Sequence, residues 1–212
     1  MIQKINFRDQ VRLHLLKQMQ KGELRLGKTI NLASLARHLD VSVTPIREAL
    51  TQLQQSQIIK AVPNRGFIIA ELNSHEAKNL YELVANMEAL AMEESEFDET
   101  ALIKLKQQQE IFMESNTALE QVNVDMEFHR LLSCNYKNEM AQQILLDLKT
   151  RIFFYERELA NEVEFYKNAH NQHDSIISAI EENNSPTAAL ILKMNWLQSL
   201  GYIQKLLEPV AL

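Results

Sequence analysis

Short helical patterns open the chain. Apolar side chains recur every three or four residues over 7–19 and again over 32–39, which predicts two amphipathic helices. A third helix is expected to begin near Ser42, because Ser42 and Thr44 are both N-cap residue types and Pro45 suits a first helical turn. The second and third helices are joined by a tight turn, which predicts a helix-turn-helix.

Two strand patterns follow the third helix. Residues 58–62 and 67–70 are rich in β-branched side chains, and the four residues between them favour a tight turn. This pattern predicts a small β-hairpin, or wing, with Arg65 and Gly66 at its tip. A further short extended piece is expected over 24–30. The wing would place a cation beside a glycine whose backbone can approach another surface closely.

The rest of the chain has a helical pattern with few interruptions. The predicted helices cover 74–96, 99–115, 117–135, 138–160, 162–182 and 187–207. The links between them are short, which favours antiparallel neighbours in a bundle. The expected fold is therefore mainly α: an N-terminal winged helix-turn-helix over 1–72 and a C-terminal all-α antiparallel helical bundle over 73–212.

The charge is distributed unevenly between these two parts. The whole chain of 212 residues has a formal net charge of −6, which by itself argues against nucleic acid as a partner. Residues 1–72, however, hold 11 Lys and Arg against 5 Asp and Glu, a net charge of +6, whereas residues 73–212 hold 11 against 23, a net charge of −12. The basic part can meet phosphate, and the asymmetry is typical of a nucleic-acid module joined to another domain.

Composition also bears on the compartment. The single cysteine, Cys134, cannot form a disulfide within the chain, and no apolar run is long enough to cross a bilayer or to form a signal-peptide core. We therefore expect a cytoplasmic protein without a membrane partner.

The chain resembles the GntR regulators, in the FadR-type branch that carries an FCD ligand-binding domain. The motif comprises Leu32-x-x-Leu35-Ala36, the run from Val41 to Leu50, and then Leu53, Ile58 and Gly66. The resemblance spans nearly the whole chain. It implies a bacterial transcription repressor, not an enzyme, that binds a palindromic double-stranded DNA operator as a homodimer. In such proteins the third helix enters the major groove and the wing tip reaches the minor groove.

The same resemblance implies which residues contact DNA. They are Arg8, Ser42, Thr44, Arg47, Arg65 and Gly66. Taken alone, Ser42 and Thr44 could be plain helix caps, but their place in a helix-turn-helix with a wing favours DNA contact. The chain departs from the family at Val43, where the family usually has arginine. One base-reading donor pair is therefore missing, and an operator sequence or an affinity that differs from the family's commoner pattern is expected.

The helical part contains a candidate metal site. Asp125 and His129 are four residues apart, so their side chains share one face of one helix. His173 and Asn195 each lie 11 residues from Asn184, so they face each other if the chain turns there into an antiparallel hairpin. A hydrogen-bonded Asp–His pair without metal is the alternative interpretation.

These positions resemble the metal-binding version of the FCD domain, in which an Asp and three His surround a divalent ion such as zinc or nickel. Asp125, His129 and His173 match three of the positions, and Asn195 stands in place of the third His. An amide oxygen is a weaker ligand than imidazole for such ions, so the resemblance leaves the presence of metal open.

The resemblance further implies a small-molecule effector, with an organic acid as the first candidate. Val84 departs from the family, which commonly has an arginine at this position. Without that arginine, binding of an anionic ligand is expected to be weaker. Other branches lack the metal and take bulkier ligands, including acyl-coenzyme A. In either case Arg151, Tyr155 and Arg157 are expected to supply polar groups to the pocket. A metal-dependent hydrolase is a further alternative, but no nucleophile signature or phosphate-binding glycine loop accompanies the metal candidates.

Overall fold

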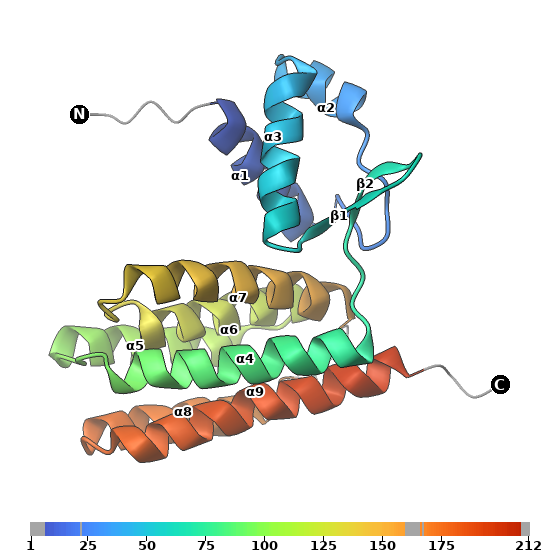
Figure 1. Cartoon of the computed structure of the whole chain (residues 1–212). Helices are drawn as coiled ribbons and strands as arrows, with labels where there is room; N and C mark the ends of the chain where they lie inside the picture. The colour runs from blue at the N-terminus through green and yellow to red at the C-terminus, as the bar shows by residue number, and fades with distance from the viewer. Residues whose placement is uncertain (1–6, 22, 160–165, 167, 209–212) are drawn as a thin grey trace, which may run out of the picture. The chain divides into compact units, whose positions relative to one another are not determined.

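The computed structural model of this chain describes residues 7–21, 23–159, 166 and 168–208. Within it the chain divides into two compact units, Met1–Glu71 and Leu72–Leu212 (Figure 1). The described elements are α-helices apart from one small two-stranded sheet. The predicted fold class, a winged helix-turn-helix followed by an all-α bundle, is confirmed.

The first unit consists of three helices and a hairpin. Its elements are α1 (Phe7–Gln20), α2 (Leu32–Leu39), α3 (Val43–Gln55), β1 (Ile59–Val62) and β2 (Gly66–Ile69). The Asn31 side chain caps α2 by accepting a hydrogen bond from the Ser34 amide at 2.9 Å, and Asp40 ends this helix in the left-handed conformation with φ of 50°. This sharp end allows α3 to begin only three residues later, as the helix-turn-helix requires.

The piece expected to be extended over 24–30 is shorter than predicted. Gly27 adopts a positive φ of 69°, and of the described residues outside the two strands only Thr29 forms a β-bridge, with Ile68. The prediction was therefore wrong for the first half of this piece, where the glycine allows a turn. The second half follows β2, since the Ile30 amide donates to the Phe67 carbonyl at 2.8 Å.

The residues described in the second unit form a bundle of six α-helices. They are α4 (Ser74–Glu93), α5 (Glu99–Glu114), α6 (Ala118–Ser133), α7 (Glu139–Leu159), α8 (Ala169–Glu181) and α9 (Ser185–Leu207). Of the helix predicted over 162–182, the structure describes Ala169–Glu181, and residues 162–165 and 167 lie outside the described residues. None of the helices described in the chain is long and apolar enough to cross a membrane.

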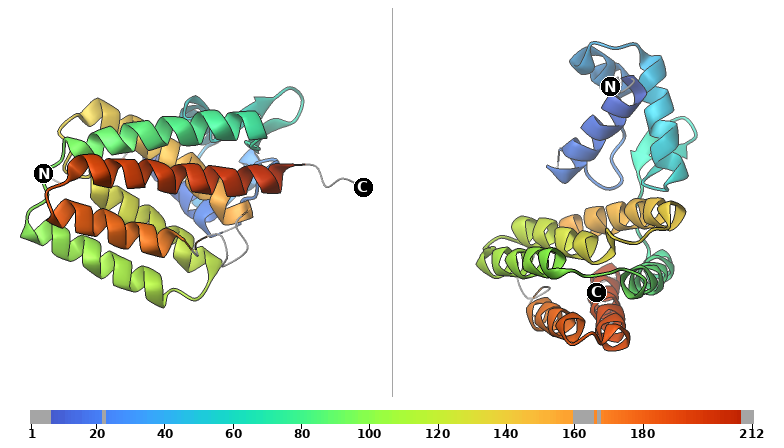
Figure 2. Two further views of the ribbon diagram at one scale, coloured as in Figure 1. Left: turned by 90° about the horizontal axis from the view of Figure 1, so that it is seen from below. Right: turned by 90° about the vertical axis from the view of Figure 1, so that its left-hand side faces the viewer.

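Polar caps fix where the bundle helices begin. Thr117 and Glu120 form a reciprocal capping box at the start of α6, and Asn184 accepts a hydrogen bond from the Thr187 amide at the start of α9. Figure 2 shows α4 and α9 side by side. They run antiparallel, because Gln204 Nε2 donates to Ser74 Oγ at 3.2 Å near one end while Trp196 contacts Glu88 further along.

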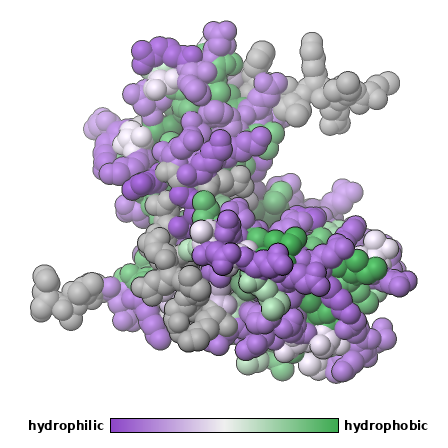
Figure 3. Space-filling view, turned by 180° about the vertical axis from the view of Figure 1, so that it is seen from behind, coloured by the Kyte–Doolittle hydropathy of each residue, from purple (hydrophilic) through white to green (hydrophobic). Residues whose placement is uncertain are grey.

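The surfaces of the two units differ in character. On the face seen in Figure 3, hydrophilic residues cover most of the winged unit, whereas hydrophobic residues remain visible at several places on the helical unit. Exposed apolar side chains of the helical unit belong to several helices, including Leu90 of α4 and Leu190 of α9.

Candidate nucleic-acid interface and metal centre

Helix α3 has one buried face and one exposed face. Ile46, Ala49, Leu50 and Leu53 are buried in the core of the first unit. The opposite side exposes Val43, Thr44 and Arg47 in the first turns of the helix. Ser42 is the N-cap residue, as expected, but its side chain makes no capping hydrogen bond, so its hydroxyl is available to another molecule. A fixed helix with an exposed N-terminal half has the form of a recognition helix.

The wing has the predicted turn. Strands β1 and β2 pair antiparallel, from Ile59 opposite Ile69 to Val62 opposite Gly66. Asn64 and Gly66 have positive φ values of 61° and 80°, and a Cβ at Gly66 would meet nothing within 4 Å. The space beside Gly66 lets another molecule approach the backbone closely.

The cations of the first unit differ in their surroundings. Arg47 and Arg65 are exposed, and neither guanidinium pairs with a carboxylate of the part of the chain that the structure describes. Arg8 in α1 contacts Asp9 through its Nε at 3.2 Å. Two of the sequence-predicted arginines therefore present unpaired charge.

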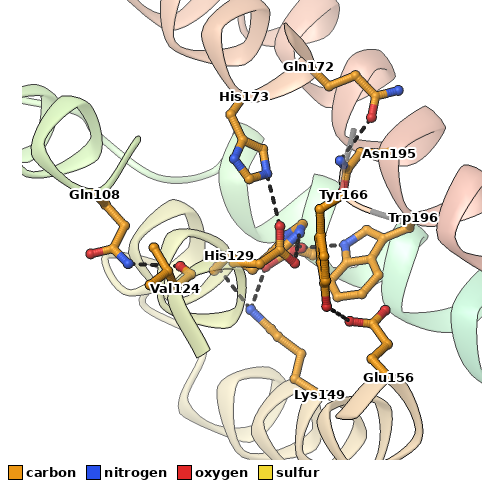
Figure 4. A network of polar contacts seen from close by, with 12 residues as sticks. Gln108, Val124, His129, Lys149, Glu156, Tyr166, Gln172, His173, Asn195 and Trp196 are labelled. Carbon is orange, nitrogen blue, oxygen red and sulfur yellow. Dashed lines mark hydrogen bonds and ion pairs between the residues drawn. The ribbon is translucent and has the colours of Figure 1, made fainter. Parts of the chain in front are cut away.

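The structure brings three of the predicted metal ligands together in the core of the bundle (Figure 4). Asp125 and His129 come from α6, and His173 comes from α8. One ligand atom from each lies within 4.8 Å of the other two. His173 Nε2 is 3.2 Å from Asp125 Oδ1, and His129 Nε2 is 3.6 Å from Asp125 Oδ2. All three side chains are buried.

The converging atoms are incompletely satisfied by the protein. Asp125 Oδ1, His129 Nε2 and His173 Nε2 are buried and make no aligned hydrogen bond to the described residues, although Asp125 Oδ1 and His173 Nε2 contact each other as an ion pair at 3.2 Å. A buried polar atom without a partner costs about 1–3 kcal/mol. These three buried ligand atoms, directed at one point, could be satisfied together by one bound ion. Two imidazoles and a carboxylate are the donor set of zinc-type ions, so the residues present fit a divalent metal.

A second layer of contacts orients His129. Its Nδ1 lies 2.8 Å from Glu88 Oε2, and the same carboxylate oxygen accepts from Trp196 Nε1 at 2.5 Å. Lys149 Nζ contacts Glu88 Oε1 and also donates to the His129 carbonyl at 3.0 Å. Because a carboxylate accepts at Nδ1, the neutral form of His129 carries its proton there and directs its Nε2 lone pair at the cluster.

His173 is oriented by an amide instead. Gln109 Nε2 donates to the His170 carbonyl at 3.0 Å and to Asp174 Oδ1 at 3.1 Å, which fixes the orientation of the amide. Gln109 Oε1 then accepts from His173 Nδ1 at 3.0 Å. Phe128 stacks on the His173 ring, with centroids 3.9 Å apart. The His173 Nε2 lone pair is therefore also held toward the cluster.

The electrostatics of the core follow from burial and these contacts. Burial raises the pKa of Glu88, but Lys149 and His129 outweigh this effect and lower the pKa to about 2. Burial lowers the pKa of His129, yet the nearby Glu88 and Asp125 carboxylates raise it overall. The pKa of His173 is lowered, chiefly by burial. His173 is thus a neutral imidazole near neutral pH, which is the form that binds a metal.

A third carboxyl group lies near the cluster. Glu156 of α7 accepts hydrogen bonds from the Tyr81 hydroxyl at 3.1 Å and from the Tyr166 hydroxyl at 3.3 Å. Burial raises the pKa of Glu156 well above its usual range, and the charge of Asp125 adds to the effect. Both effects favour the neutral, protonated form of Glu156 next to the ligand cluster.

The remaining predicted residues lie at different places. Asn195 is buried on α9, and its Nδ2 donates to Gln172 Oε1 at 2.9 Å. Arg151 and Tyr155 are buried on α7, with the guanidinium carbon 6.0 Å from the centre of the Tyr155 ring. Arg157 is half-buried on the same helix. Among the His, Cys, Asp and Glu side chains that the structure describes, the converging group consists of Asp125, His129 and His173.

Sequence reasoning missed the residues that surround the ligands. Glu88, Lys149 and Gln109 interrupt otherwise apolar buried stripes of α4, α7 and α5. A charged residue within a buried stripe is a usable signal, since such residues are seldom buried without a partner. The sequence alone, however, does not reveal which partner each one meets.

The two units together define a class of protein. A winged helix-turn-helix with an exposed recognition helix, in a part of the chain whose net charge is +6 over residues 1–72, is typical of a DNA-binding module. The chain is thus built as a DNA-binding transcription regulator.

Comparison with known proteins agrees with this class. Residues 7–69 match the family of bacterial regulatory proteins named gntR, and residues 78–195 match the FCD domain. The HTH-type transcriptional repressor GlaR of Escherichia coli K12 is 24% identical over 199 residues, covering 87% of this chain and 90% of that protein. The HTH-type regulator YdhC of Bacillus subtilis 168 is 32% identical over 150 residues, covering 70% and 61%.

A solved structure shows the same fold. A GntR transcriptional regulator from Rhodococcus sp. RHA1 has a TM-score of 0.82 at 16% identity, covering 93% of this chain and 97% of that chain. The chain therefore belongs to the GntR family of bacterial transcription regulators, with an FCD domain after its winged helix-turn-helix.

Proposed function

We propose that this regulator is a cytoplasmic repressor whose FCD domain binds a small organic acid through a divalent metal ion. The observation that carries the proposal is the convergence of three buried ligand atoms that make no aligned hydrogen bond to the described residues, Asp125 Oδ1, His129 Nε2 and His173 Nε2. The repressor role is supported by the relative GlaR, which is named a transcriptional repressor.

Zinc or nickel is the ion that suits this donor set best. When bound, such an ion supplies a Lewis acid that attracts the carboxylate of an organic acid. Three protein ligands leave coordination positions of the ion open. We propose that the effector and the Asn195 amide oxygen occupy them. Because this amide is neutral, it leaves the ion more of its positive charge for an anionic effector than a carboxylate would.

The effector pocket is proposed to include Arg151, Tyr155 and Arg157 of α7. Support comes from their position on α7, the helix that also carries Glu156. The charge of Asp125 raises the pKa of the Glu156 carboxyl group, which places this helix near the ligand cluster. An arginine and a phenol are the groups that hold an organic acid by hydrogen bonds and charge.

DNA contact is proposed for the six residues named from the sequence. Support comes from the exposure of Thr44 and Arg47 on α3, the unused Ser42 hydroxyl and the open backbone at Gly66. Arg65 at the wing tip and Arg8 in α1 are assigned to the phosphates or the minor groove.

A homodimer is proposed through α4 and α9. The outer faces of these antiparallel helices expose Leu83, Leu90, Leu190, Met194 and Leu197, each between 45% and 59% accessible. Gly201 continues the α9 stripe, and a Cβ there would meet nothing within 4 Å. A glycine inside a helix is destabilising relative to alanine, and the open space around Gly201 means that no neighbour in the chain requires it. Close approach of a second copy would account for it.

Helix α9 connects the proposed effector site with the proposed dimer interface, so it can transmit a conformational change from one to the other. Its buried side carries Trp196, whose ring lies 4.1 Å from the His129 ring, while its outer side carries Met194 and Leu197. A ligand that displaces α9 would therefore shift both faces, and in a dimer this would change the spacing of the two winged domains.

Metal titration of the full chain tests the proposal. Trp196 is the only tryptophan, so its fluorescence reports on the His129 environment. We expect zinc added to chelator-treated protein to change the fluorescence with a stoichiometry of one ion per chain, and expect no such change in Asp125→Ala. His75→Ala, which removes an exposed histidine, should behave like the unmodified protein. Bound metal below about one-tenth of an ion per chain, with no thermal shift on adding zinc or nickel, would overturn the proposal.

A further inference from the structure

Val43 is an apolar side chain on an otherwise polar surface. It is 37% exposed, whereas the other exposed side chains of α3 are Thr44, Arg47, Glu48, Thr51, Gln54 and Gln55. Residues 43, 47 and 54 share one strip of the helix surface at the period of 3.6 residues per turn. Val43 therefore lies beside Arg47 at the N-terminal end of the exposed face.

The position of Val43 is fixed by the core beneath it. Helix α3 begins at Val43 and is held by Ile46 and Leu50, which are fully buried. A valine side chain is short and has few rotamers, so it presents its methyl groups at a defined place. In a helix-turn-helix, the N-terminal residues of the recognition helix contact base edges in the major groove. Val43 is the first of these residues.

The chemistry of Val43 limits what it can recognise. Its side chain has no hydrogen-bond donor or acceptor, so it reads none of the polar groups of the bases. Thymine presents the one apolar group of the standard bases in the major groove, its C5 methyl. We propose that Val43 selects a thymine in each operator half-site by packing against this methyl group, next to the base contacted by Arg47. The inference rests on the proposed DNA contact of α3.

The test replaces single thymines by deoxyuridine, which removes only the methyl group. Duplexes that bind the full chain are first selected from random-sequence DNA, and the affinity of each thymine-to-deoxyuridine version is then measured. We expect one thymine in each half-site, beside the base pair at which Arg47→Ala relaxes the sequence preference, to lose about fourfold in affinity per methyl group removed.

Two variants test whether Val43 causes the loss of affinity on replacement of thymine by deoxyuridine. Val43→Ala should bind the thymine and deoxyuridine duplexes nearly equally, and alanine is compatible with the first turn of a helix. Leu13→Ala, which shortens an exposed apolar side chain of α1, should keep the fourfold difference.

The outcomes separate this inference from the proposed DNA contact. If sequences are enriched but no deoxyuridine replacement weakens binding, Val43 reads no methyl group and the inference is overturned. A penalty that persists in Val43→Ala overturns it as well, because another residue then reads the methyl. If no sequence is enriched at any salt concentration, the proposed DNA contact of α3 itself fails, and the inference fails with it.

Discussion

Glu88 Oε2 lies 2.8 Å from His129 Nδ1, at a point where α4 meets α6 in the buried core. The same carboxylate contacts Lys149 of α7 and Trp196 of α9. One acidic side chain thus joins four helices and at the same time orients a proposed metal ligand. Its ionisation couples the stability of the bundle to pH.

The first prediction concerns acid stability. The pKa of Glu88 is lowered from 4.5 to about 2 in the folded protein, so the folded state gains stability from this group above its unfolded pKa. This contribution is lost as the pH falls from about 5 toward 2, and it amounts to roughly 3 kcal/mol at 1.36 kcal/mol per pKa unit.

Urea unfolding at a series of pH values measures this effect in metal-free protein. Glu88→Gln should be less stable at pH 7 and should lose less further stability on acidification than the unmodified chain. Glu93→Gln, which changes an exposed residue of the same helix, is the control. Identical pH profiles for Glu88→Gln and the unmodified protein would contradict the assignment.

A second prediction concerns Gln109. Because its amide oxygen holds the His173 Nδ1 proton, Gln109→Leu should leave His173 poorly oriented and weaken zinc binding by about 10–100-fold. Zinc competition against a chelating dye measures the change. Gln107→Leu alters an exposed residue of the same helix and should leave the affinity unchanged. Unaltered zinc affinity in Gln109→Leu would show that this contact does not position His173.

A third prediction concerns the DNA interface. Arg47→Ala should weaken binding to a selected operator by about 1–3 kcal/mol and relax its sequence preference, whereas Arg65→Ala, if Arg65 contacts a phosphate, should reduce the salt dependence of binding. Fluorescence anisotropy at several salt concentrations separates the two effects. Arg130→Ala in the helical unit, where Arg130 pairs with Glu127, serves as the control. Full retention of affinity and preference in Arg47→Ala would remove it from the interface.

A fourth prediction concerns the dimer. Leu197→Glu places a charge in the proposed α4–α9 interface and should shift the protein from dimer to monomer in sedimentation velocity. Ile103→Glu introduces the same charge at an apolar residue of α5 with similar exposure and should leave the dimer intact. A dimer that survives Leu197→Glu and dissociates in Ile103→Glu would place the interface elsewhere.

The sequence predicted the fold class well because each element carries its own signals. The apolar period of three and four marks the helices, and the turn chemistry before Gly66 marks the hairpin. The errors lie where a signal is ambiguous: Gly27 turns the chain within a piece that was expected to be extended throughout. For the helix predicted over 162–182, residues 162–165 and 167 lie outside the described residues, and α8 covers Ala169–Glu181.

The metal candidates were predictable for a similar reason. Asp125 and His129 share a helix, so their spacing alone brings them together, and the hairpin geometry together with the family resemblance added His173. Glu88, Lys149 and Gln109 depend on how distant helices pack, which no local pattern encodes. Their charge or polarity within apolar stripes marks them as buried polar groups but does not identify their partners.

The metal centre is tested most directly by anomalous X-ray scattering from crystals of the full chain grown with zinc or nickel. Data collected on both sides of the absorption edge of the metal locate the ion independently of any assumption about its ligands. The account predicts one anomalous peak in the bundle core, roughly 2.0–2.2 Å from Asp125 Oδ1, His129 Nε2 and His173 Nε2. A fully occupied ion elsewhere, with no anomalous peak between these three atoms, would contradict it.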